Sequence, residues 1–391
     1  MAKKLFLWLH QWLGLLTGIV IVLVSLSGSL YVFSDELKEL VYKDRVFVKT
    51  PNTGGALPLS TLQEHAQQAL GPAYKITRAE IYPDKRRSWI FRASQTDSSA
   101  IGHWNYYKYY YRVYVNPYNG KVLYIEDSKN EFFQLVLNLH MNLLLGGRIG
   151  SSLVGYAVIA FVFILISGLV LWWPQEWSRK KLKKSFRIKR KASSKRLNYD
   201  LHNVLGFYIL IPVFIIALTG LVFSFKWVDD SMQYVFNGGT STTKRAIPTS
   251  APATLGNGDK ALDRAVHAVL QAHGDADLLS IRFRPGETTP IDIQTRLLKS
   301  RTHIFVWYYF DRQNGNLLMK YSDADLQGGE KVRSMNYDLH VGSIGGTGTK
   351  ILAFGVSLIC ASLPITGFLI WYNKKRKKKK RQNKRPGMRI P

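Results

Sequence analysis

Long apolar segments alternate with polar blocks along this chain. A bilayer core is crossed by about 20 helical residues, and four uncharged or nearly uncharged runs reach that length. The pattern therefore predicts four transmembrane helices, over 5–34, 149–175, 201–225 and 351–373.

The first of these runs has a second interpretation, because Lys3 and Lys4 precede it as they would in a secretory signal. The apolar core of a signal peptide is only about 7–15 residues long, and the run is longer. We expect a retained helix with a cytoplasmic N-terminus.

The two larger polar blocks, 35–131 and 226–335, show the same order of patterns. Each contains a stretch of helical pattern, over 57–70 and 260–273, and continues with runs of alternating polarity that are typical of strands. An Asn-Gly pair then follows in each block, at Asn119 and Asn314, and indicates a hairpin turn. We expect two small external α+β domains.

The two halves of the chain repeat each other. The letters NYDLH occur at 198–202 and again at 336–340, and looser Leu-His pairs end at His10 and His140. The predicted fold is an α-helical membrane protein, with a four-helix transmembrane bundle from two parallel repeats and two external α+β domains.

The predicted boundaries follow from these patterns. They are 1–34 for transmembrane helix 1, 35–131 for external domain 1, 132–175 for the His140 segment and transmembrane helix 2, 176–200 for a cytoplasmic basic loop, 201–225 for transmembrane helix 3, 226–335 for external domain 2, 336–373 for the His340 segment and transmembrane helix 4, and 374–391 for a cytoplasmic basic tail.

The net charge of +28 is concentrated beside the apolar segments. Eleven Lys and Arg residues lie between Arg179 and Arg196, and eleven more lie between Lys374 and Arg389. Such clusters orient a membrane protein by the positive-inside rule, whereas a nucleic-acid partner would favour a basic surface on a soluble domain. The single cysteine, Cys360, excludes an internal disulfide and a cysteine-based metal site.

The predicted topology pairs four histidines. His10 and His202 begin outward-running helices, whereas His140 and His340 precede inward-running ones. A lone histidine there would most simply hydrogen-bond a neighbouring helix, but two symmetric pairs favour ligation. Two imidazoles are too few for zinc, which takes four ligands, whereas haem iron needs only two axial ligands. The pattern favours two bis-histidine haem sites at different depths.

Small and basic residues near these histidines suit a porphyrin. Glycine lets a flat macrocycle approach a helix, although close helix packing produces the same pattern, and a basic residue can neutralise a propionate. The predicted cofactor-lining residues are Gly14, Gly18, Gly206, Gly147, Gly346, Arg148 and Lys350.

Aromatic clusters occupy matching places in the two external blocks. They could hold an organic chelate by stacking and cation–π contacts, although aromatic residues are also common in strands. The predicted substrate residues are Trp104, Tyr107, Tyr110, Arg112, Trp307 and Tyr309.

These motifs resemble those of one family. The Leu-His motifs and the stretches LHMNLLLGG and LHVGSIGG are similar to the PepSY-associated transmembrane family, and the external blocks resemble PepSY domains. The resemblance implies a bacterial inner-membrane protein with two b-type haems, ligated by His10, His202, His140 and His340. It also implies periplasmic external domains, and one branch of the family reduces ferric siderophores.

We therefore expect a ferric siderophore reductase that transfers electrons across the membrane and releases Fe(II), which hard oxygen ligands hold less tightly than Fe(III). The sequence has no GxGxxG fingerprint or P-loop, so the donor, a quinol or a cytosolic reductase, must be a separate molecule. Membrane lipid surrounds the helices, and nucleic acid is not an expected partner. Two alternatives stay open: a non-redox regulator or anchor of a periplasmic partner, and a histidine-lined metal transporter.

Overall fold

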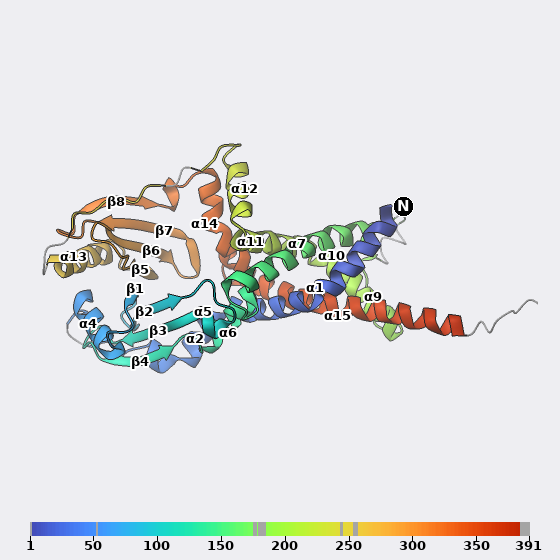
Figure 1. The fold of residues 1–391 in the computed structure, drawn as a ribbon, viewed down its shortest axis with the longest axis horizontal. Coiled ribbons are helices and arrows are strands. Elements are labelled where there is room, and N and C mark those ends of the chain that lie inside the picture. The colour runs from blue at the N-terminus through green and yellow to red at the C-terminus, as the bar shows by residue number, and fades with distance from the viewer. Residues whose placement is uncertain are drawn as a thin grey trace, which may run out of the picture.

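The computed structural model describes residues 2–51, 54–174, 178, 185–242, 245–252 and 257–383. A β-sheet lies at one end of an elongated molecule, and long helices lead away from it (Figure 1). The N-terminus and the end of the last helix lie at the opposite end. We call the two ends the sheet end and the basic end. The predicted basic loop and tail fall partly outside the described residues.

Three described helices are long and apolar enough to cross a membrane. They are α1 (Ala2–Val32), α7 (Gly147–Trp172) and α15 (Thr347–Asn383). α1 packs along both of the others. Leu16 and Ile19 on α1 are nevertheless 78% and 73% exposed, and such large apolar side chains on an outer face suit contact with lipid.

The third apolar segment forms a broken span. α9 (Ser194–Asp200), the π-helical turn η1 (Leu201–Leu205) and α10 (Gly206–Tyr208) run together, and α11 (Leu210–Ser224) continues after a bend of 65°. Pro212 lies in the first turn of α11, and a proline at this place favours a bend, because it has no N–H to donate to the carbonyl four residues earlier.

Shorter helices connect the spans to the sheet. Glu131 caps α6, since its carboxylate accepts hydrogen bonds from the backbone N–H groups of Phe133 and Gln134, each at 2.9 Å. Gly342 ends α14 with a φ of 77°, which favours glycine. The connecting elements are α2 (Ser34–Val41), α3 (Lys43–Val46), α5 (His103–Tyr106), α6 (Phe132–Asn142), α12 (Lys226–Phe236), η2 (Asp323–Asp325), α14 (Gly328–Val341) and η3 (Ser343–Gly345).

The polar blocks build one antiparallel sheet of eight strands, in the order β4-β3-β2-β1-β5-β6-β7-β8. The predicted hairpins are present, with Gly120 and Gly315 at φ values of 69° and 72° in the turns. The strands are β1 (Ile76–Ile81), β2 (Trp89–Thr96), β3 (Tyr107–Val115), β4 (Val122–Asp127), β5 (Leu278–Arg282), β6 (Ile291–Leu298), β7 (Arg301–Phe310) and β8 (Leu317–Ser322).

One face of the sheet carries the main hydrophobic core. α4 (Leu59–Leu70) and α13 (Asn257–Ala272) cover this face with buried residues such as Leu62 and Val269 (Figure 1). Alternate strand residues, including Phe91 and Ile293, point into this core. Their neighbours along each strand therefore project from the opposite face, which we call the polar face.

The prediction of a four-helix bundle carrying two separate external domains is wrong. Among the described residues only three single helices qualify as spans, and the fourth segment is bent. The external blocks share one sheet because β1 pairs with β5. Sequence patterns report the pairing of strands that follow one another. They do not predict whether two half-sheets join at their edges. Each edge strand has unpaired backbone groups, so an edge can pair with a strand from a distant part of the chain.

Candidate functional site

Two pairs of histidines come together between the helices. The ring centroids of His10 and His202 are 6.2 Å apart, with an interplanar angle of 90°. Those of His140 and His340 are 5.9 Å apart, at 60°. The first pair lies toward the basic end and the second toward the sheet end.

The two pairs occupy different levels of the structure. His10 is on α1 itself, whereas His140 contacts the same helix at Val24. Fourteen residues of α-helix, at 1.5 Å each, separate these levels by about 21 Å.

A neighbouring helix holds each imidazole through Nδ1. The Nδ1 atoms of His10 and His202 lie 3.1 Å from the carbonyl oxygens of Ile164 and Leu363. In the second pair, Nδ1 of His140 lies 2.8 Å from the carbonyl oxygen of Val24, and His340 contacts Ile216 in the same way at 3.0 Å.

A carbonyl oxygen can only accept a hydrogen bond, so Nδ1 carries the proton and Nε2 keeps its lone pair. Histidines that ligate metals usually donate their other N–H to such a group, which fixes the tautomer and the ring orientation. Each of the four imidazoles therefore has an unprotonated Nε2, which is the form that can bind a metal.

A glycine faces each of the four histidines, and a hydroxyl lies beside three of them. Three hydroxyl oxygens lie close to the histidine Nδ1 atoms: Ser167 at 3.0 Å from His10, Thr366 at 2.9 Å from His202 and Thr219 at 3.0 Å from His340. The following glycines, Gly168, Gly367 and Gly220, face the same rings, and Gly28 after Ser27 faces His140. A side chain larger than hydrogen would crowd the imidazole at each of these glycines.

A cavity of about 320 Å³ surrounds the pair at the basic end. His10 and His202 both line it. Three of the predicted glycines, Gly14, Gly18 and Gly206, line it as well, together with aromatic residues such as Trp172. The predicted glycine stripe therefore borders open space beside the histidines.

The geometry of the pairs can be compared with what a haem requires. A metal–imidazole nitrogen bond is about 2 Å long and the nitrogen is about 1.1 Å from its ring centroid, so two axial imidazoles have centroids about 6.2 Å apart. The distances of 6.2 and 5.9 Å match this value. Within the described residues no group of three or more His, Cys, Asp or Glu could hold a metal ion. The residues thus fit an iron whose other ligands belong to a porphyrin.

Other predicted cofactor residues lie elsewhere. Lys350 is buried, and its Nζ pairs with Glu36 at 2.6 Å, so its charge is already compensated. Arg148 is exposed in the first turn of α7. Gly147 faces Tyr106, and Gly346 lies near the Arg301 guanidinium.

Sequence comparison identifies the family. A family model described as the PepSY-associated TM region matches residues 7–374. This chain belongs to that family. It is therefore a PepSY-associated membrane protein, as its motifs suggested, and the match includes all four paired histidines. No curated protein gives a significant match.

Five of the six predicted substrate residues lie on the polar face of the PepSY-associated protein's sheet. Tyr107, Tyr110 and Arg112 belong to β3, whereas Trp307 and Tyr309 belong to β7. Five strand spacings of about 4.8 Å separate these strands, so the two clusters lie about 24 Å apart. Trp104 is exposed on α5, and its ring contacts His103, which also contacts Tyr107.

Salt bridges link charged groups on the polar face. Glu126 is buried and pairs with Arg112 at 3.0 Å and with Arg45 at 3.2 Å. Burial alone would raise the pKa of Glu126, but Arg112, Ser128 and Arg45 together hold that pKa below its ordinary value. Both guanidiniums therefore need this carboxylate in its charged form.

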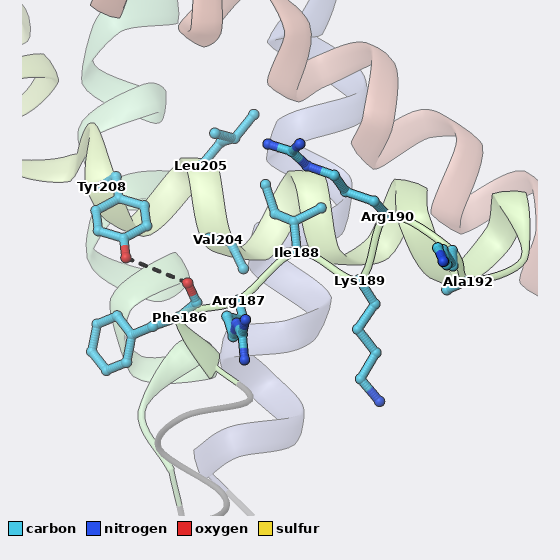
Figure 2. Close-up of a pocket in the computed structure, with 10 residues that line it drawn as sticks. Phe186, Arg187, Ile188, Lys189, Arg190, Ala192, Val204, Leu205 and Tyr208 are labelled. Carbon is cyan, nitrogen blue, oxygen red and sulfur yellow. Dashed lines mark hydrogen bonds between the residues drawn. The ribbon is translucent and has the colours of Figure 1, made fainter.

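A second cavity, of about 990 Å³, lies at the basic end. Figure 2 shows Arg187, Lys189 and Arg190 around it, with the Tyr208 hydroxyl donating to the Phe186 carbonyl oxygen at 3.4 Å. No histidine lines this cavity. Its basic character agrees with the charge pattern expected beside a span.

The hydroxyl-glycine pairs are the part of the site that the histidine motifs did not identify. Ser27-Gly28, Ser167-Gly168, Thr219-Gly220 and Thr366-Gly367 place one such dipeptide in each apolar segment. The recurrence is visible in the sequence, but only the structure shows that each dipeptide faces a histidine from another segment.

Proposed function

We propose that this PepSY-associated membrane protein is a b-type dihaem reductase that reduces ferric siderophores and releases Fe(II). His10 and His202 would hold one haem, and His140 and His340 the other. The observation that carries the proposal is the geometry of the two pairs, with centroid distances of 6.2 and 5.9 Å and every Nδ1 held by a carbonyl.

When bound, such a haem supplies one-electron redox chemistry. Two imidazoles per iron would leave no position free for oxygen, which suits electron transfer. The protein's part would be to fix the imidazole planes and tautomers, through the carbonyls of neighbouring apolar helices.

The sheet-end pair is joined to the polar face by direct contacts. The Tyr107 hydroxyl lies 3.5 Å from Oδ1 of Asn138, two residues before His140 on α6. On the other side, buried Asp338, two residues before His340, accepts a hydrogen bond of 2.6 Å from the His303 ring on β7. The sheet that would hold a substrate is thereby positioned over the sheet-end histidines.

Reduction of the substrate iron explains release. Fe(III) in a siderophore is bound by hard oxygen ligands, and the softer Fe(II) is bound less tightly by the same groups. We place the sheet in the periplasm of a bacterium and the basic end at the cytoplasmic face of the inner membrane, where a quinol or a cytosolic reductase would donate electrons. The clusters of Lys and Arg at the basic end support this orientation.

The test is the oxidised-minus-reduced visible spectrum of the purified protein, together with haem content per chain. We expect two haems per chain, loss of one in His10→Ala and in His340→Ala, and reoxidation of the reduced protein by a ferric siderophore. A colourless protein would refute the proposal and favour a non-redox regulator. Metal flux through vesicles containing haem-free protein would instead favour a transporter.

A further inference from the structure

Four arginines occupy directly opposed positions on adjacent strands of the polar face. Arg112 of β3 is opposite Arg92 of β2, Arg92 is opposite Arg78 of β1, and Arg78 is opposite Arg282 of β5. We call Arg112, Arg92, Arg78 and Arg282 the arginine row. It crosses the junction of the two half-sheets, which β1 and β5 form.

Such a row is costly for the sheet. Like charges directly opposite each other on neighbouring strands destabilise the pairing, and Arg78 has an arginine on both sides. Burial, and then Arg92 and Arg282, lower the pKa of Arg78. A stability role for this arrangement is therefore a poor explanation of Arg78.

Carboxylates offset only part of this charge. Glu126 pairs with Arg112 at 3.0 Å, Glu80 with Arg92 at 2.8 Å and Asp292 with Arg282 at 3.1 Å. Arg78 has no salt bridge or hydrogen bond from its guanidinium among the described residues. A ligand anion could supply the partner that Arg78 lacks.

Two further arginines share the same acids, because Arg45 also pairs with Glu126 and Arg284 also pairs with Asp292. Lys38 and Glu131, which lie 3.9 Å apart beside this group, cancel each other. These six arginines share three carboxylates, so positive charge exceeds negative charge along the row.

Aromatic side chains border the row at both ends. The Tyr110 hydroxyl accepts hydrogen bonds from Arg92 at 2.5 Å and from Arg112 at 2.7 Å. The Arg282 guanidinium lies 4.5 Å from the centre of the Trp307 ring. Arg92 and Arg282 keep 25% and 21% of their side chains exposed, whereas Arg112 keeps 14%. Arg78 is also partly exposed, so a ligand can reach the middle of the row and its Arg282 end.

The row is also connected to the sheet-end histidines. Tyr107 stacks on Tyr110 with centroids 5.5 Å apart, and the Tyr107 hydroxyl reaches Asn138 on the helix that carries His140. A metal chelate on the row would therefore lie on the side of the sheet from which the His140 and His340 pair is reached.

We infer that the arginine row binds a polyanionic metal chelate, whose metal ligands are catecholate or carboxylate oxygens. This inference deepens the proposed function, because it names the class of ferric chelate that the protein accepts. Guanidinium groups form paired hydrogen bonds with anionic oxygens and stack on aromatic rings, so both features of the row match a catecholate complex.

The experiment measures binding to the full-length protein in detergent by isothermal titration calorimetry, with gallium(III) chelates. Gallium(III) imitates the size and charge of iron(III) but is not reduced, so binding is separated from haem chemistry. The probes are a trianionic gallium tricatecholate, anionic gallium citrate and a neutral gallium trihydroxamate. We expect the tricatecholate or the citrate to bind at least tenfold more tightly than the trihydroxamate.

Substitutions then locate the site. Arg78→Gln removes a charge-assisted contact, so we expect binding of the anionic chelate to weaken about tenfold or more. Thermal stability should be unchanged or higher, because a like-charge contact is relieved. Arg86→Gln removes an equal charge from an exposed turn and should leave binding unchanged.

Three results would overturn the inference. They are equal binding of the neutral trihydroxamate, wild-type affinity in Arg78→Gln, and a clear loss of stability in Arg78→Gln, which would make the row structural. Binding of an anionic gallium chelate by a protein without haem would instead leave this inference standing and refute the proposed function. The two failures are therefore distinguishable.

Discussion

Gly28→Ala tests whether His140 must occupy the position that the structure gives it. A Cβ added at Gly28 would lie 2.7 Å from Cε1 of His140, whereas ordinary contacts begin at 3.4 Å. The imidazole would have to withdraw by about 0.7 Å. Metal–ligand distances tolerate a change of only about 0.2 Å, so we expect His140 to lose its ligand position.

The other three glycines provide an internal scale. An added Cβ would lie 3.2 Å from Cε1 of His202 at Gly367, and 3.3 Å from Cε1 of the facing histidine at Gly168 and Gly220. These contacts need a retreat of only 0.1–0.2 Å, which is within the tolerance. Alanine at these three positions should therefore leave both haems in place.

The assay is haem content per chain by the pyridine haemochrome method, together with the electron paramagnetic resonance spectrum of the oxidised protein. We expect Gly28→Ala to fall from two haems to one and to lose one low-spin signal. Gly348→Ala is the control, because Gly348 is exposed in the first turn of α15 and an added Cβ meets nothing within 4 Å.

In Gly28→Ala, helix propensity and the contact with His140 predict opposite effects, so the result distinguishes between them. Alanine in place of glycine inside an unobstructed helix would stabilise it by about 1 kcal/mol, so helix propensity predicts a gain where the contact with His140 predicts a loss. Two intact haems in Gly28→Ala, with both low-spin signals unchanged, would refute the reasoning.

Three further predictions concern the hydroxyls and the buried charges. Thr219→Val removes the hydroxyl 3.0 Å from Nδ1 of His340 and should weaken haem retention about 10–100-fold, as measured by haem transfer to apomyoglobin; an unchanged transfer rate would contradict this. Glu126→Gln leaves Arg112 and Arg45 without their carboxylate and should cost about 3–5 kcal/mol, seen as a lower midpoint of thermal unfolding by tryptophan fluorescence. In the folded protein the pKa values of Glu80 and Glu126 lie below their ordinary 4.5. These two carboxylates therefore stabilise the folded protein fully above pH 4.5, and this stabilisation is lost as the pH falls through the lower folded-state pKa values. A thermal unfolding midpoint that rises on acidification below pH 4.5 would contradict this prediction.

Patterns that repeat over a few residues could be read directly from the sequence. The apolar runs that became α1, α7 and α15 were predicted because hydrophobicity along a helix is local information. The hairpins at Asn119 and Asn314 were predictable for the same reason, since two turn residues determine them. The histidine pairs followed from the internal repeat, which places equivalent residues about an axis.

Other features could not be read in this way. The bend after Tyr208 depends on how α10 and α11 pack, and Pro212 indicated only that a kink was possible there. Lys350 was predicted to contact a propionate, but α2 brings Glu36 to it from more than three hundred positions away in the chain. Contacts of this kind depend on the fold of the whole chain.

The sequence alone thus determined the apolar segments, the turns, the four histidines and the family, because each depends on neighbouring residues or on a repeated motif. The tertiary structure decided the pairing of β1 with β5, the contact of each histidine with a glycine from another segment, and the alignment of four arginines on one face. These features arise where separate segments meet. Which segments meet depends on burial and backbone pairing over the whole chain, and a local sequence pattern does not predict this.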